Sequence, residues 1–203
     1  MTANQFWIWF QNNEHKIYIL PLLTKEERQN YYYWFMKNLE YYCKGLGFKI
    51  NFADDYHGTA TLTITAYGVK ELYPKVIELV EAAPKIDNWR FEAFIKQQEP
   101  KGDSHPYTFG NLEINVKDLS FQPVKYIKST GKLIIHIYFD KKFSSLQTQG
   151  SNPAITFILE DLLGEILLYA KIKKFKFYKN NRNRGITYKL SHLKTYLDLI
   201  NQN

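Results

Sequence analysis

The 203-residue chain has little of what builds disulfide-linked, cysteine-metal or membrane-spanning proteins. A single cysteine, Cys43, excludes a disulfide framework and any zinc finger built on cysteines. No apolar run in the sequence reaches the roughly 18 residues expected of a membrane-spanning helix. The first ten residues lack the basic start and the small-residue cleavage site of a signal peptide. These absences predict a cytoplasmic protein without a membrane segment.

Glycine and proline are also few, with 10 and 7 residues, and charged residues make up 23% of the chain. This composition, with 45% hydrophobic residues, excludes disordered and low-complexity classes. A chain of this length buries about 70% of its surface, which is enough for a core without covalent staples. The sequence contains no glycine-rich phosphate loop and no HExxH motif. We therefore expect no enzyme, no cofactor and no metal.

Hydrophobic periodicity predicts an α+β fold in which helices pack on a mostly antiparallel sheet, in the order αα-ββαβ-β-ββαβ-α. The predicted helices cover residues 3–18, 25–44, 70–83, 153–169 and a last segment that Ser191 caps. The predicted strands cover residues 48–53, 60–66, 89–95, 112–116, 121–127, 133–139 and 172–178. The ββαβ order occurs twice, and each block could form a split crossover of ferredoxin-like type. Whether the repeat is a true duplication stays open.

We expect a single compact domain over residues 1–203. The segment 96–111 combines two prolines, two glycines and four charges, which is typical of a loop. It predicts two lobes, residues 1–96 and 112–203, joined by a loop over 97–111.

Several short motifs are similar to one known family. They are FWIWF at 6–10 with Asn13-Glu14, TKEER at 24–28, LTITAYG at 62–68, VIELVEAAP at 76–84, Trp89, Ala93-Phe94 and Leu163-Gly164-Glu165. Together they resemble a family of bacterial cytoplasmic proteins, common in Bacteroidetes, that has no assigned activity. The resemblance covers nearly the whole chain and is specific over 6–94, whereas 171–189 is more basic than the family pattern. It implies a bacterial single-domain protein and no mechanism.

The net charge of +7 is concentrated near the C-terminus. Nine basic residues and no acidic residue lie between Ile166 and Leu197, so the rest of the chain has a net charge of −2. Aromatic residues alternate with this basic segment, 171–194, as expected of a surface that neutralises phosphates and stacks bases. The candidate nucleic-acid or partner surface consists of Lys173, Lys174, Lys176, Arg182 and Arg184. Two alternatives stay open, a lysine-protected edge strand and a surface for an acidic protein.

Aromatic residues make up 17% of the chain. The first two predicted helices contain more of them than one buried face of each helix requires. Trp7, Trp9 and Trp34 are therefore candidates for a protein interface, with burial in the core as the alternative. Glu165 is the acidic residue of the same candidate interface. Glu165 and Asp161 share one helix face and are the candidate carboxylates of an unrecognised hydrolase, or part of an ordinary solvated strip.

Three other groups carry weaker signals. Asp54, Asp55 and His57 fit a tight turn better than a metal site. Cys43 fits the core of its helix, and His136 fits a structural position in an apolar strand.

The sequence as a whole favours a non-enzymatic protein–protein interaction or regulatory module. A nucleic-acid-binding protein that uses segment 171–194 is the alternative.

Overall fold

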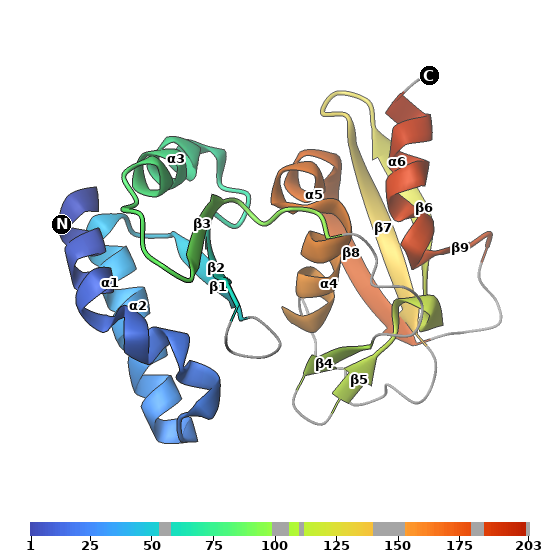
Figure 1. Cartoon of the computed structure of the whole chain (residues 1–203). Helices are drawn as coiled ribbons and strands as arrows, with labels where there is room; N and C mark the ends of the chain where they lie inside the picture. The colour runs from blue at the N-terminus through green and yellow to red at the C-terminus, as the bar shows by residue number, and fades with distance from the viewer. Residues whose placement is uncertain (53–57, 99–105, 110–111, 140–152, 180–184, 202–203) are drawn as a thin grey trace. The chain divides into compact units, whose positions relative to one another are not determined.

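The chain divides between Ile95 and Lys96 into two compact units, which we call unit 1 and unit 2 (Figure 1). The computed structural model describes residues 1–52, 58–98, 106–109, 112–139, 153–179 and 185–201. Six α-helices and three mostly antiparallel sheets in this part of the chain confirm the α+β class. The expected single domain over the full length stays a prediction.

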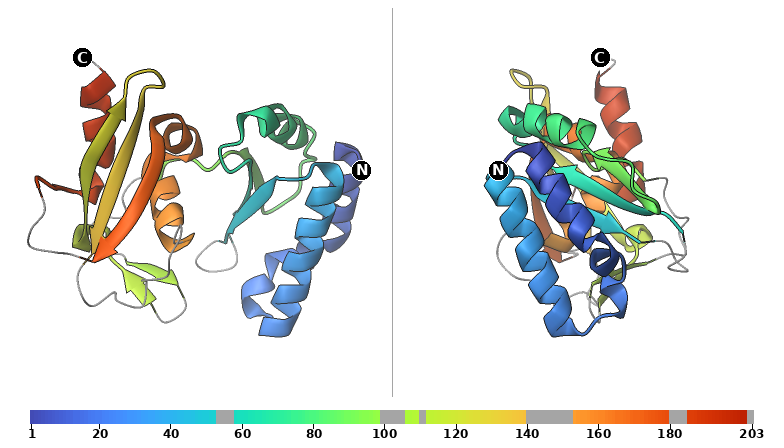
Figure 2. Two further views of the ribbon diagram at one scale, coloured as in Figure 1. Left: turned by 180° about the vertical axis from the view of Figure 1, so that it is seen from behind. Right: turned by 60° about the vertical axis from the view of Figure 1, so that its left-hand side comes forward.

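Unit 1 begins with two helices, α1 (Ala3–Tyr18) and α2 (Lys25–Tyr42), which lie side by side (Figure 2). Thr24 and Glu27 form the capping box that the sequence predicts at the start of α2. Each side chain there accepts a hydrogen bond from the backbone N–H of the other residue. After α2 the chain turns at Gly45, whose φ of +95° is accessible to glycine at little steric cost.

A three-stranded sheet completes unit 1. Its strands are β1 (Gly47–Asn51), β2 (Ala60–Thr65) and β3 (Trp89–Ala93), in the order β1-β2-β3. β1 pairs antiparallel with β2, and β3 pairs parallel with β2 after a crossover. The crossover contains the short 3-10 helix η2 (Lys70–Leu72) and α3 (Tyr73–Glu81). Edge-to-face rings dominate the core, where Trp7 lies 4.5 Å from Phe91 and Phe10 lies 5.0 Å from Trp89 between ring centres.

Unit 2 has a four-stranded sheet in the order β8-β7-β6-β9. The strands are β6 (Leu119–Ile127), β7 (Lys132–Phe139), β8 (Ile172–Lys179) and β9 (Tyr188–Lys189). β6 pairs antiparallel with both β7 and β9, whereas β8 pairs parallel with β7. β8 is therefore an edge strand of this sheet. A separate small hairpin consists of β4 (Tyr107–Phe109) and β5 (Leu112–Ile114).

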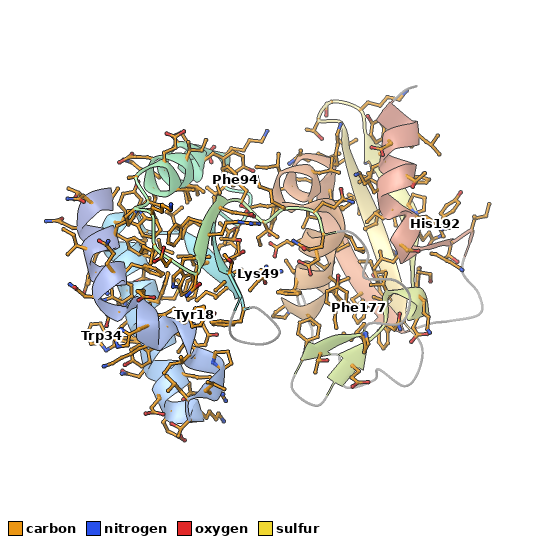
Figure 3. The ribbon with its side chains drawn as sticks, viewed as in Figure 1. Tyr18, Trp34, Lys49, Phe94, Phe177 and His192 are labelled. Carbon is orange, nitrogen blue, oxygen red and sulfur yellow. The ribbon has the colours of Figure 1, made fainter. Side chains whose placement is uncertain are left out.

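The core of unit 2 lies between this sheet and three helices. These helices are α4 (Pro153–Leu163), α5 (Glu165–Lys171) and α6 (Leu193–Asn201). Leu133, Ile135, Ile137 and Phe139 alternate along β7 and pack in one cluster with apolar residues of all three helices. On β8, Phe177 stacks on Phe139 with 4.3 Å between ring centres (Figure 3).

Several sequence expectations need correction. The predicted helix over 153–169 is broken at Gly164, whose φ of +74° separates α4 from α5. Ser191 lies within the 3-10 turn Leu190–His192 that precedes α6, rather than at its N-cap. The expected loop contains β4, and the pattern missed β9.

The ββαβ order does occur in both units, at β1-β2-α3-β3 and at β6-β7-α4-α5-β8. In each unit the last strand pairs directly with the second strand of its hairpin. No described strand lies between them, so the split crossover of the ferredoxin-like arrangement does not form.

Candidate functional site

The sheet of unit 2 has one face against the helices and one face turned away from them, as the left panel of Figure 2 shows. Side chains alternate between faces along a strand, and residues directly opposite on paired strands share a face. The alternation on β7 and the pairing register assign the second face, which we call the open face. Its side chains include Ser120, Gln122, Lys125, Ile134, His136, Tyr138, Lys174, Lys176, Tyr178 and Lys189.

Three rows run across the open face. The first row joins Lys125, Ile134 and Lys174, so that an apolar residue of β7 lies between two lysines. A second row joins Gln122, His136 and Lys176. Lys174 and Lys176 are exposed and lie two residues apart on β8, about 6.6 Å along the strand.

The third row brings polar and aromatic residues together. It joins Lys189, Ser120, Tyr138 and Tyr178 across all four strands. Lys125 and Lys189 are exposed, so lysines lie on both sides of the middle strand β7. The open face thus combines a basic margin with an aromatic centre.

The aromatic centre is a contact cluster of three rings. The Tyr178 ring centre lies 4.7 Å from that of His136 and 5.9 Å from that of Tyr138. The Tyr138 hydroxyl donates a hydrogen bond of 2.8 Å to Oε1 of Gln122, which fixes this ring. Tyr138 is buried, whereas Tyr178 is 38% exposed. Tyr178 is therefore an accessible ring that two neighbours hold in place.

Charge on the open face has one sign. Its described side chains include four lysines and no carboxylate. Unit 2 has 17 basic and 9 acidic residues, a net charge of +8, whereas 10 basic and 11 acidic residues leave unit 1 at −1. Burial and then the positive charge of Lys176 lower the pKa of His136, so its imidazole favours the neutral form. The margin of lysines therefore carries the positive charge of this face.

The structure describes only some of the basic residues that the sequence predicts as a binding surface. Lys174 and Lys176 lie on the open face, and Lys173 is an exposed residue at the irregularity where the β7–β8 register shifts. Arg182 and Arg184 lie outside the described residues. Sequence reasoning did not connect Lys125, His136, Tyr138 and Lys189 with this surface. The period of two on strands 121–127 and 133–139 was the signal that could have done so.

The three tryptophan candidates have different environments. Trp7 is 1% exposed and belongs to the core of unit 1, so it presents no surface to a partner. Trp9 is half-buried, with its ring centre 5.5 Å from that of Phe35. Trp34 on α2 is 48% exposed and lies 5.3 Å from the ring of Tyr33, which is also exposed (Figure 3).

The candidate carboxylates are buried in unit 2. Glu165 is 0% exposed at the start of α5, and Asp161 and Glu160 on α4 are buried as well. The Tyr169 hydroxyl donates to Glu160 over 3.0 Å. Burial, followed by the charge of Asp161 and its hydrogen bond, raises the pKa of Tyr107 to about 12. Glu160 and Asp161 thus have partners inside the unit, and the burial of all three acids means that they add little negative charge to its surface.

Metal and membrane features can be stated for the described part of the chain. No group of three or more histidine, cysteine, aspartate or glutamate side chains there is placed to hold a metal ion. Asp54, Asp55 and His57 lie outside the described residues. Among the described helices, none is long and apolar enough to cross a membrane.

Searches against protein-family models, curated proteins and solved structures find no significant match to this chain.

Proposed function

We propose that the protein binds nucleic acid through the open face of unit 2. The observation that carries this proposal is the single sign of charge on that face, with four lysines and no carboxylate among its described side chains. Lysines that neutralise phosphates release counterions from the nucleic acid, and this release supplies most of non-specific affinity. The net charge of +8 on unit 2 favours the same ligand.

Protection of an edge strand explains part of the same pattern. β8 is an edge strand, and charged side chains prevent such strands from pairing with another sheet. Either sign of charge serves that purpose, although lysine is common. All charged side chains assigned to this face are lysines, and one of them, Lys125, lies on β6 rather than on the edge strand β8. Edge protection does not explain this, and a polyanionic ligand does.

The sequence favours a protein partner instead, and exposed aromatic residues of α2 support that alternative. Tyr33, Trp34 and Tyr41 are all exposed on this helix. Nothing on this surface indicates the chemistry of a partner, because the three rings fit many apolar surfaces. The nucleic-acid proposal is more specific, since it follows from charge.

Fluorescence anisotropy with a labelled oligonucleotide tests the proposal. Four phosphate contacts predict a slope of about −3 for log K against log salt, or a loss of about 50-fold between about 50 and 200 mM salt. The variant K174Q/K176Q should bind more weakly and reduce the magnitude of the slope by about 1 to 2. K16Q/K25Q removes the same charge from exposed positions in unit 1 and should leave binding nearly unchanged.

Two results would overturn the proposal. One is absence of binding by the wild-type chain at about 50 mM salt, where phosphate contacts are strongest. The other is an equal loss in both double variants, which would assign the effect to net charge rather than to the open face.

A further inference from the structure

We infer that the ligand of the open face is a single strand of nucleic acid, whose bases stack on Tyr178 beside the lysines of β8. This inference rests on the proposed function and narrows it to one substrate class. It follows from the position of the exposed Tyr178 ring, from the contacts that hold this ring in place, and from the width of the sheet.

The exposed ring and the lysines lie within reach of one nucleotide chain. Tyr178 is the next residue after Lys176 on the open face of β8, about 6.6 Å along the strand. His136 lies directly opposite Lys176 on β7, one strand spacing of about 5 Å away. A backbone held by Lys174 and Lys176 can therefore place a base over the Tyr178 ring. Stacking of this kind requires an unpaired base, because the faces of paired bases are covered by their neighbours in the duplex.

The Tyr178 ring is also prepared for stacking. His136 and Tyr138 contact it from β7, and the hydrogen bond from Tyr138 to Gln122 orders that support. A ring that neighbours already hold loses less side-chain entropy when a base covers it. Edge protection by lysine accounts for none of these three rings.

The dimensions of the sheet argue against the major groove of a duplex. At the row of Lys189, Ser120, Tyr138 and Tyr178, four strands span three spacings, about 14 Å before side chains are added. The major groove of B-form DNA is about 12 Å wide and admits a helix or a two-stranded ribbon. A face of this width can lie along a flexible single strand, but it cannot enter that groove.

Three probes of equal phosphate number test the inference with the full-length chain. They are a labelled oligothymidine, an adenine–thymine duplex of half its length, and an abasic single strand of its full length that keeps the sugar–phosphate backbone. The oligothymidine should bind at least about 10-fold more tightly than either of the other two probes, because only the oligothymidine offers free bases. Y178L should weaken binding of the oligothymidine by about 5- to 150-fold and leave binding of the abasic strand nearly unchanged.

Two further variants separate stacking from folding. Y178F keeps the ring and should retain binding. Y126L changes a tyrosine that is 42% exposed on β6, and its partner Leu133 places it on the other face of the sheet. This variant should bind like the wild type. If Y178L does not fold, the wild type with three probes and Y178F still decide the question.

The outcomes distinguish the two proposals. Equal binding of duplex, abasic strand and oligothymidine, with loss in K174Q/K176Q, would overturn the single-strand inference and leave nucleic-acid binding intact. No binding of any probe would overturn both. An acidic polypeptide of equal charge that competes as well as oligothymidine would also contradict the inference, because it offers charge without bases.

Discussion

The indole N–H of Trp7 donates a buried hydrogen bond of 2.8 Å to the backbone carbonyl of Leu79. Leu79 lies in the last turn of α3, where carbonyl groups have no partner further along the helix. The neighbouring carbonyls of Glu78 and Val80 accept from the N–H groups of Ala82 and Ala83. Trp7 thus joins α1 to the end of α3 and satisfies a carbonyl that the helix itself leaves open.

The first prediction concerns this contact. W7F removes the donor and leaves a smaller ring in a fully packed site, so it should lower the free energy of unfolding by about 2 to 3 kcal/mol. W34F makes the same exchange at an exposed position of α2 and should cost no more than about 0.5 kcal/mol. Urea titration followed by circular dichroism measures both values. Equal values for the two variants would contradict the assigned hydrogen bond.

A second prediction concerns Gly47 and Tyr67. A Cβ atom at position 47 would collide with the phenol ring of Tyr67, whose backbone has a φ of +49°. G47A should therefore lower the free energy of unfolding by about 1 to 3 kcal/mol. In a Y67A background the collision is absent, and the same substitution should cost less than about 0.5 kcal/mol, because alanine suits a strand better than glycine. A double-mutant cycle measures the coupling, and additive effects would contradict the contact.

Local chemistry explains which elements the sequence predicts well. The start of α2 follows from Thr24 and Glu27, because a capping box involves only neighbouring residues. The hairpin of β6 and β7 follows in the same way from its turn residues. By contrast, apolar periodicity continues through Gly164, so the pattern could not indicate that the backbone turns there and starts a new helix.

The candidate site was harder to predict because strand pairing creates it. Lys174 and Lys176 stand out in the sequence, but their position beside His136 depends on a parallel pairing with residues forty positions earlier in the chain. Lys125 joins them only after an irregularity at Pro123 and Lys125 shifts the β6–β7 register. Long-range register and the packing partners of each helix face are properties that one segment does not encode by itself.

A third prediction concerns acid stability at the start of α2. Hydrogen bonds from Thr24, first from its backbone N–H and then from its hydroxyl, lower the pKa of Glu27 below 4.5. The carboxylate therefore contributes stability that is complete above the unfolded pKa and is lost as the pH falls through the folded pKa. E27Q should be less stable than the wild type at pH 7, and the difference should shrink toward about pH 3.

E26Q is the matched control, since Glu26 is an exposed carboxylate in the same helical turn. It removes the same charge and keeps the capping box. Its stability relative to the wild type should change with pH less than that of E27Q. Urea titrations over the pH range measure both variants, and identical pH profiles would contradict the role of the Thr24 hydrogen bonds.

The last prediction concerns the ionisation of His136 on the open face. Its surroundings on that face are Gln122 of β6, Tyr138 of β7, and Lys176 and Tyr178 of β8, with no carboxylate among them. Burial and the charge of Lys176 lower the pKa of His136 below 6.5, because both disfavour the imidazolium. The unfolded chain then binds this proton more readily, so the contribution of His136 to stability is complete above pH 6.5 and declines as the pH falls below it.

An NMR titration of the His136 ring measures this pKa directly. K176M should raise it by removing one of its two causes, whereas K174M should change it less, because Lys174 lies opposite Ile134. A bound phosphate chain should raise it as well, since an anion near the ring stabilises the imidazolium. A His136 pKa above 6.5 in the free protein would contradict the predicted lowering, and a pKa that K176M leaves unchanged would show that Lys176 does not act on the ring. The same titration with oligothymidine present then reports whether negative charge reaches the centre of the open face or stays at its lysine margin.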